Sequence, residues 1–240
     1  NGVLKKWPNY DVPVSGIITI PESVVAIDNG VFANYKDLKK VNFPSRLKSI
    51  GDNAFKGCTA LAIAALPDSL QSIGKQAFYC TQLKTLTVGT QLTFVGNSAF
   101  ENCSTLQQVE LPAAATTFGS RVFAGCKSLK KVVLPDHLTT LPKSTFFNCY
   151  ELTEVTLPSL LQHIEGAVFW QCRSLKQITL PSQLQSIGSG VFAGCSSLTS
   201  LTFPASVRLI GESLFNGCDH LEHLTCLSPN PPSFPEDTTD

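Results

Sequence analysis

The 240-residue sequence predicts an α/β repeat solenoid, in which the chain winds into stacked coils that share one continuous core. The first observation behind this prediction is a phenylalanine that recurs nine times, from Phe32 to Phe215, with gaps of 23, 23, 22, 23, 23, 23, 23 and 23 residues. The second is that one pattern of apolar residues, proline and glycine returns around each of them, as in Ile178–Ser200. A fixed period of this length indicates units that bury their apolar faces only against their neighbours.

Each repeat begins with an apolar residue, a variable residue, an apolar residue and then a proline, as in Val41–Pro44. This alternation predicts a short half-buried strand, which ends at the proline because proline has no N–H to donate. A second apolar pair follows, such as Leu184 and Ile187. Phenylalanine, cysteine and leucine then recur three residues apart, which places them on one side of a helical turn. We therefore expect a parallel sheet on one face, and short strands with short helical or 3-10 turns on the other.

Two further columns of the repeat predict local backbone geometry. Glycine usually follows the second apolar pair, but Pro142 takes that place in one unit and fixes a negative φ, so we expect a tight turn or a close approach of the backbone there instead of a left-handed residue. Glycine or asparagine usually precedes the cysteine and predicts a left-handed residue, with Gln171 as the exception. In the 22-residue interval, the missing residue is expected between Phe78 and Cys80.

The repeat pattern divides the chain into three parts. Residues 1–15 predict an irregular N-terminal capping coil in which Trp7 covers the end of the core, and residues 16–227 hold nine to ten tandem repeats of about 23 residues. Residues 228–240 form a Pro-rich acidic tail or an interrupted further repeat. The chain has no Met and begins at Asn1, which suggests a fragment, and it has no run of 18 apolar residues that would predict a membrane span.

Charge excludes a general affinity for nucleic acid or anionic membranes, because 18 Lys and Arg balance 18 Asp and Glu. The distribution is uneven: residues 1–131 carry 14 basic against 8 acidic side chains, and residues 132–240 carry 4 against 10. One interpretation is drift among solvated surfaces. The alternative is a dipole along the long axis that orients a charged partner.

Nine cysteines are present, and eight of them recur with the repeat: Cys58, Cys80, Cys103, Cys126, Cys149, Cys172, Cys195 and Cys218. We interpret this column as buried free thiols that act as small apolar residues, with scattered disulfides as the alternative. The spacing contains no Cys-x-x-Cys pair and gives no tetrahedral cluster, so no metal site or cofactor is predicted. Cys226 occupies a strand position filled elsewhere by Leu or Phe, and it too is expected in the core.

No catalytic residues are predicted. The four histidines, His137, His163, His220 and His223, fall in columns that do not bring a nucleophile, a base and an acid together. No phosphate-binding loop, dinucleotide fingerprint or HExxH sequence occurs. The sequence therefore predicts a protein that is not an enzyme.

The segments Leu38–Pro44, Leu152–Pro158 and Leu198–Pro204, together with Phe55, Cys58, Phe192 and Cys195, resemble the BspA-like leucine-rich repeat of bacterial and protist surface proteins. The resemblance extends from about Gly16 to Cys226. It implies a right-handed leucine-rich-repeat arc, secretion or surface display, and adhesive binding to proteins or host surfaces. No binding residue is carried over, because the family has no fixed binding motif.

The exposed strand positions supply the first candidate binding surface, on the predicted concave sheet face. The candidates are Lys39, Lys40, Asn42, Ile63, Ala65, Lys84, Thr87, Gln108, Glu110, Lys131, Val133, Thr156, Thr179 and Thr202. The alternative is a solvated face whose threonines serve only the packing of the sheet.

A second candidate surface lies on the turn side, where Phe147 and Trp170 follow the repeated phenylalanine in neighbouring coils. Neighbouring exposed aromatic rings indicate a contact patch. The alternative is that both rings pack down on their own turns.

We expect a non-catalytic extracellular or cell-surface module that recognises a protein or a glycan through the exposed solenoid face. The expected partners are extracellular or host proteins, or glycans, with no nucleic acid, and the oligomeric state stays open. The alternative is a structural spacer that presents another domain.

Overall fold

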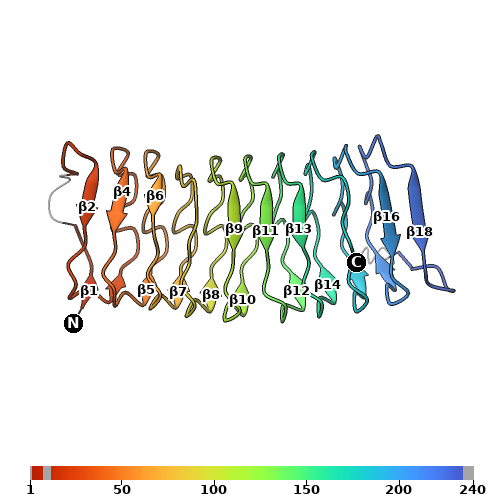
Figure 1. The fold of residues 1–240 in the computed structure, drawn as a ribbon, viewed down its shortest axis with the longest axis horizontal. Helices are drawn as coiled ribbons and strands as arrows, with labels where there is room; N and C mark the ends of the chain where they lie inside the picture. The colour runs from red at the N-terminus through yellow and green to blue at the C-terminus, as the bar shows by residue number, and fades with distance from the viewer. Residues whose placement is uncertain (1, 8–11, 235–240) are drawn as a thin grey trace, which may run out of the picture.

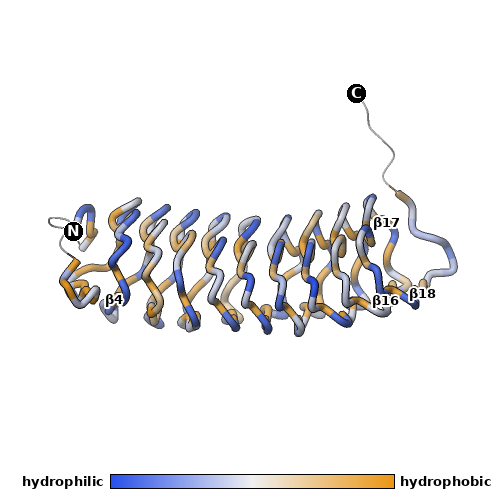
Figure 2. Tube along the Cα trace, turned by 90° about the horizontal axis from the view of Figure 1, so that it is seen from above, coloured by the Kyte–Doolittle hydropathy of each residue, from blue (hydrophilic) through white to orange (hydrophobic). Residues whose placement is uncertain are grey.

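The computed structural model describes residues 2–7 and 12–234, which wind into an elongated stack of coils (Figure 1). We number coils 1–9 by the repeated phenylalanine that each contains, from Phe32 to Phe215. Seen from above, the coils form a single row, and apolar stretches return at similar places in successive coils (Figure 2). The described residues contain no helix, and so none that is long and apolar enough to cross a membrane.

The predicted strands before the proline column form the first sheet. Its strands are β2 (Ile17–Thr19), β4 (Lys40–Asn42), β6 (Ile63–Ala64), β9 (Gln108–Glu110), β11 (Lys131–Val133), β13 (Glu154–Thr156), β16 (Ser200–Phe203) and β18 (His223–Cys226). All pairs are parallel and in register, so Val41 lies opposite Ile18 and Val132 opposite Val109. The sheet has three parts, β2-β4-β6, β9-β11-β13 and β16-β18, which are separated at residues 85–87 of coil 4 and 177–179 of coil 8.

The second apolar pair of each repeat forms the second sheet, also parallel, which has a six-stranded and a four-stranded part separated between residues 118 and 140. Its strands are β1 (Val3–Leu4), β3 (Ala26–Ile27), β5 (Ser49–Ile50), β7 (Ser72–Ile73), β8 (Phe94–Val95), β10 (Thr117–Phe118), β12 (Thr140–Leu141), β14 (His163–Ile164), β15 (Ser186–Ile187) and β17 (Leu209–Ile210). These strands have two residues each. The last residue is buried in most of them, because it belongs to the apolar column that faces the core.

The segment around each phenylalanine consists of successive turns. The Cys58 N–H donates to the Phe55 carbonyl at 3.2 Å and the Leu61 N–H to the Cys58 carbonyl at 3.0 Å, the spacing of 3-10 turns. The same segment also bonds to the next coil, as where the Phe32 N–H donates to the Ala54 carbonyl at 2.8 Å. The predicted turns are therefore present, although none continues into a helix.

Two left-handed residues flank every repeated phenylalanine. The residue two positions after it has positive φ in all nine coils, and Gln171, the expected exception, follows the rule with φ 60°. The residue two positions before it is also left-handed, at φ 53–66°, a column that the sequence pattern did not reveal. It includes Arg121 and Ala167, so the turn imposes this geometry even on side chains that disfavour it.

The phenylalanine rings form a continuous stack along the core. Neighbouring ring centroids lie 4.9–6.2 Å apart with interplanar angles of 4–12°. From Phe32 to Phe192 every ring is completely buried, whereas Phe215 at the end is only partly buried. The constant repeat length places each ring directly over the previous one.

The glycines after the second strand are explained by close approach, one of the two predicted reasons. None of these glycines has positive φ. A Cβ at Gly51 would lie 2.8 Å from the Asn29 N of the preceding coil, and a Cβ at Gly211 would lie 2.2 Å from the Ser189 N. At these glycines a side chain would collide with the backbone of the preceding coil.

The cysteine column differs from the prediction at one coil. Thr81, not Cys80, is the buried residue three positions after Phe78, and Cys80 has φ 58° in the left-handed column. The assignment of Cys80 to the column and the expected position of the missing residue were therefore wrong. The chain is one residue shorter between Thr81 and the buried Leu83, because other repeats have two residues between these columns, such as Thr59 and Ala60.

The two ends of the core differ. The Trp7 ring lies 5.4 Å from that of Phe32, and β1 extends the second sheet over the first coil. At the other end, Ser233 pairs with Leu209 and forms one further rung, while β18 is exposed along its length. Cys226 is exposed, so its predicted place in the core was wrong, because no described segment covers that end of β18. The division at residues 15 and 227 stays a prediction.

We predict that Phe123→Ala lowers the free energy of unfolding by about 3–5 kcal/mol, because it opens a cavity between two rings of the stack. Urea denaturation followed by circular dichroism measures the change. Phe234→Ala is the control, since this side chain is 67% exposed and its loss is expected to cost less than about 0.5 kcal/mol. Equal losses in both variants would contradict a role of the stack in stability.

We predict that Gly211→Ala destabilises the protein by about 1–3 kcal/mol, because its new Cβ would overlap the backbone of coil 8. Gly166→Ala is the matched control: it also lacks positive φ, and its nearest neighbour would be 3.3 Å away. The difference between the two melting temperatures tests the close-approach explanation, which fails if Gly166→Ala is the more harmful change.

Candidate functional site

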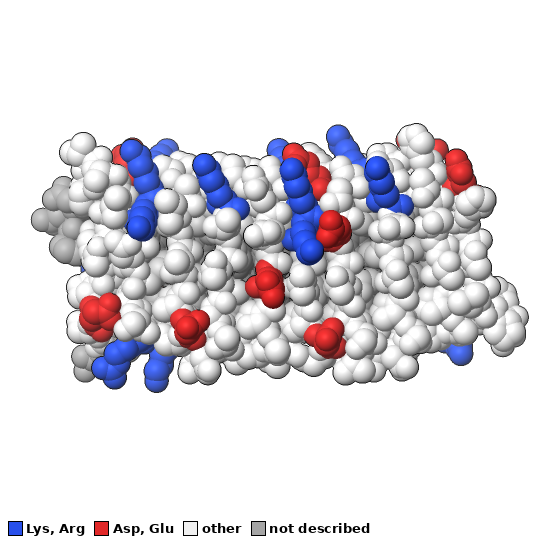
Figure 3. Space-filling view, in the orientation of Figure 1, with Lys and Arg blue, Asp and Glu red and all other residues white. Residues whose placement is uncertain are grey.

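The outer side of the first sheet is the largest regular surface that the core leaves free. In β2, β9 and β11 the middle residue is buried and its two neighbours point outward, as the alternation requires. The predicted sheet-face residues therefore lie together on one surface, with Asn42, Lys40 and Val133 partly buried and the others exposed. This face, with its charged side chains, is visible in Figure 3.

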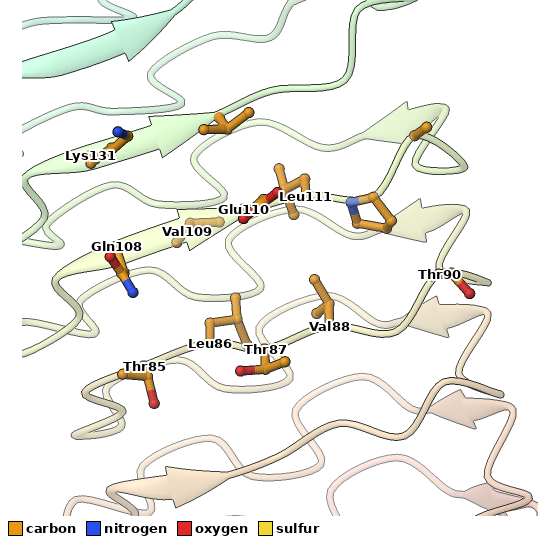
Figure 4. A pocket seen from close by; sticks show the side chains of 13 residues that line it. Thr85, Leu86, Thr87, Val88, Thr90, Gln108, Val109, Glu110, Leu111 and Lys131 are labelled. Atoms are coloured by element: carbon orange, nitrogen blue, oxygen red, sulfur yellow. The ribbon is translucent and has the colours of Figure 1, made fainter.

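A hollow interrupts this face at coil 4, where residues 85–87 form no strand. In the first sheet, these residues are connected to the neighbouring coils by the single bridges Ala65 to Thr87 and Leu86 to Val109. The hollow has a volume of about 730 Å³. Its lining combines apolar side chains with the polar groups of Thr85, Thr87, Gln108, Glu110 and Lys131 (Figure 4). Five predicted residues meet here: Thr87, Gln108, Glu110, Lys131 and Val133.

The interruption coincides with two departures from the repeat. The chain is one residue short just before this segment, between Thr81 and Leu83. Gly89 also replaces the proline that ends the strand elsewhere, and a Cβ at Gly89 would lie 2.2 Å from the Asp68 Cα. Coil 4 therefore closes on coil 3 at this corner, and full pairing along the strand is lost.

A second interruption occurs at coil 8, where residues 177–179 form no strand. Two shallow hollows of about 600 Å³ and 310 Å³ lie on either side of it. Thr156 lines the first, Thr202 the second, and Thr179 both. These three predicted residues lie outside the coil 4 hollow, whose lining ends at Lys131 and Val133 of β11.

The remaining predicted sheet-face residues lie toward the N-terminal end. The Asn42 amide donates to the Thr19 hydroxyl at 3.0 Å, so this pair forms part of a ladder of polar side chains. Ile63 is 55% exposed beside Ala65 and is the apolar point of this region. Lys39 and Lys84 extend from the edge of the sheet, outside the strands.

The turn-side aromatic residues pack on one another. Phe147 and Trp170 are partly buried, with ring centroids 6.2 Å apart, and the guanidinium of Arg121 lies over the Phe147 ring at 5.4 Å. Arg121 also forms an ion pair of 2.7 Å with the buried Glu101, and this hydrogen bond raises the pKa of Arg121. Trp170 lies against Gly190, where a Cβ would be 2.8 Å from the ring. The patch is therefore a cross-coil brace of stacked side chains.

A model of the BspA type leucine-rich repeat region, with six copies of the repeat, matches residues 15–130 and 116–231. The chain belongs to the BspA-type leucine-rich repeat family. No curated protein sequence matches it.

Solved structures with the same fold as this BspA-type protein include two bacterial leucine-rich repeat proteins. That from Bacteroides ovatus is 33% identical with a TM-score of 0.82, over 88% of this chain and 55% of its own. That from T. pallidum is 28% identical with a TM-score of 0.65, over 82% of each chain. This chain therefore spans little more than half of the Bacteroides ovatus structure.

The cysteine column of this BspA-type protein is structural. All nine cysteines are free, and seven thiols donate to the phenylalanine carbonyl of the preceding coil at 3.0–3.3 Å, as Cys58 does to Phe32. Burial raises the pKa of Cys58 and Cys103 to about 12 and raises those of the other buried thiols in the column. Because metals and nucleophilic reactions require the thiolate, these groups are unsuited to either. Within residues 2–7 and 12–234, no cluster of His, Cys, Asp or Glu could hold a metal ion.

Sequence reasoning missed Thr85 and Thr90 in the coil 4 hollow. The sequence pattern places Thr85 at an exposed strand position. It lines a hollow because residues 85–87 form no strand. The available signal was the 22-residue interval together with Gly89, since two departures in one coil mark a local change of path.

We predict that the free energy of unfolding falls as the pH rises from about 8.5 to 11. The sign follows from proton binding: the unfolded thiols titrate near 8.5, while the folded ones stay protonated toward pH 12, so the unfolded state binds fewer protons in this range. Each such thiol contributes a slope of about 1.4 kcal/mol per pH unit. Urea denaturation at pH 7, 8.5 and 10 measures it, and Cys103→Ala is expected to have the shallower slope. A flat profile in the parent protein would contradict protonated burial.

Proposed function

We propose that this chain is a non-catalytic binding module, extracellular or displayed on a cell surface, that recognises a protein through the outer side of the first sheet. The coil 4 hollow carries the proposal, because the regular face becomes concave there and offers several side chains to one ligand. Thr85, Thr87 and Gln108 supply hydrogen-bonding groups there, and Val133 supplies an apolar contact.

The rigidity of the scaffold supports the proposal. The strands on either side of the hollow are fixed by a continuous core, in which Leu86, Val109 and Val132 are almost completely buried. A preorganised surface loses little conformational entropy on binding, so modest contacts along it can add up to a specific interaction. Glu110 and Lys131 at the border place opposite charges near each other, which favours a partner of defined orientation.

The extracellular location is part of the proposal and rests on the family, which is typical of surface proteins. Antibodies to this chain, applied to intact and to permeabilised source cells, test this location. Labelling of intact cells is the expected result. Labelling only after permeabilisation would contradict the location.

We predict that Thr87→Arg with Val133→Arg, two substitutions that fill the hollow with charged side chains, weakens binding to an extracellular protein at least tenfold. Surface plasmon resonance against fibronectin, laminin and type I collagen is the measurement. Ser159→Arg is the matched control, because Ser159 is exposed at a corner outside the hollow. If the double variant binds like the parent, the hollow is not the site. If none of these proteins binds the parent chain, the spacer alternative is favoured.

A further inference from the structure

Cationic side chains recur on every second coil along one edge of the first sheet. Lys39, Lys84, Lys130 and Lys176 each occupy the first position after the inward leucine that precedes the strands of coils 2, 4, 6 and 8, and all four are exposed. We call these four residues the lysine row. The intervening coils have Ala62, Gln107 and Thr153 at the same position. Figure 3 shows Lys and Arg spaced along the upper edge of this face.

Charged residues at neighbouring positions of the same edge also alternate between even-numbered and odd-numbered coils. The edge segments before coils 2–8 comprise residues 36–40, 59–63, 82–85, 104–108, 127–131, 150–154 and 173–177. They contain nine cations and three carboxylates, an excess of six positive charges in a chain with formal net charge zero. All nine cations precede even-numbered coils, and two of the three carboxylates, Glu151 and Glu154, precede coil 7.

The spacing of the row follows from the stacking of the coils. Strands of one sheet lie about 4.8 Å apart, so lysines on alternate coils are separated by roughly 10 Å, and the row extends over roughly 29 Å. The residues between them are small or uncharged, so a linear ligand can lie along the edge without meeting a bulky or acidic side chain in the row itself.

Few of these charges are neutralised within the protein. Lys130 lies 3.7 Å from Glu151 and Lys131 lies 3.3 Å from Glu154, with both side chains exposed in each pair, so the pairs are weak and readily exchanged. Throughout the part of the chain that the structure describes, Lys39, Lys84 and Lys176 form no ion pair. Such a row attracts an anionic polymer over long distances.

We propose that the lysine row binds a linear acidic polysaccharide whose anionic groups lie on alternate sugars. One extended pyranose unit spans about the rise of one coil, so a disaccharide repeat matches the two-coil period of the charges. The amides and hydroxyls between the lysines, in Gln107, Thr153 and Gln177, are suited to hydrogen bonds with sugar hydroxyls.

Other polyanions fit this edge less well. Phosphates follow each other far more densely along nucleic acid than these lysines do, and single strands are usually held by free aromatic rings. Tyr150 is the aromatic residue in these segments, and Arg173 and Lys127 already cover its ring at 4.5 Å and 5.9 Å. An acidic protein would need an apolar centre in its interface, and Ile63 is the main exposed apolar side chain there.

The inference does not rest on protein recognition at the coil 4 hollow, and its test is separate. Binding of hyaluronan, which carries a carboxylate on every second sugar, to the full chain is measured by isothermal titration calorimetry at 50 mM and 200 mM NaCl. We expect binding that weakens steeply with salt, since it releases counterions. Dextran, a neutral polysaccharide, is expected not to bind.

The lysine row variant changes Lys39, Lys84, Lys130 and Lys176 to Gln, and its affinity is expected to fall at least tenfold with a smaller salt dependence. The matched control changes Lys6, Lys48, Lys75 and Lys143 to Gln, an equal loss of charge at exposed positions away from the row, and should keep its affinity. Unchanged melting temperatures establish that both variants fold.

Four results would overturn the proposal. They are no binding of hyaluronan at 50 mM NaCl, equal weakening in both variants, equal binding of dextran, and tighter binding of single-stranded DNA or polyglutamate than of hyaluronan. The substitutions in the coil 4 hollow leave the lysine row intact, so a negative result there concerns only the proposed protein site.

Discussion

The stack of nine phenylalanine rings is the interaction on which the rest of the structure depends. Parallel rings about 5–6 Å apart require every coil to return at the same height, so they fix the repeat length and the register of both sheets. The left-handed residues on both sides of each phenylalanine turn the chain sharply enough to hold the ring inside. The thiols then donate to the phenylalanine carbonyls, which satisfies polar groups at the centre of the core.

Because the core is so uniform, function has to reside in the columns that it does not use and in the coils where it departs from the pattern. Coil 4 is the clearest departure: it combines a missing residue and Gly89 with the loss of the strand and a hollow lined by Thr87 and Gln108. The turn side shows the opposite case. There Arg121, Phe147 and Trp170 brace neighbouring coils, so an unusual set of side chains contributes to packing.

Stacking of the repeats gathers charged residues from distant parts of the sequence on one surface. Six excess positive charges at one edge are invisible in a formal net charge of zero. Stacking brings lysines that are about two repeats apart in sequence into a line, with the spacing set by the coils themselves. The charge distribution on the surface is therefore better described by the lysine row along one edge of the sheet than by the surplus of basic residues in the first half of the sequence.

The sequence by itself determined the solenoid, its period, the inward columns and the absence of left-handed geometry at the glycines after the second strand, because each follows from a local pattern repeated along the chain. It also placed the sheet-face residues on one surface. Tertiary structure decided what one repeat cannot show: that Thr81 replaces Cys80 in the column, that Cys226 is exposed at the end of the core, and that coil 4 is hollow. These outcomes depend on how one coil meets the next: the 22-residue interval and Gly89 mark where the path changes, but the contacts between coils decide what results.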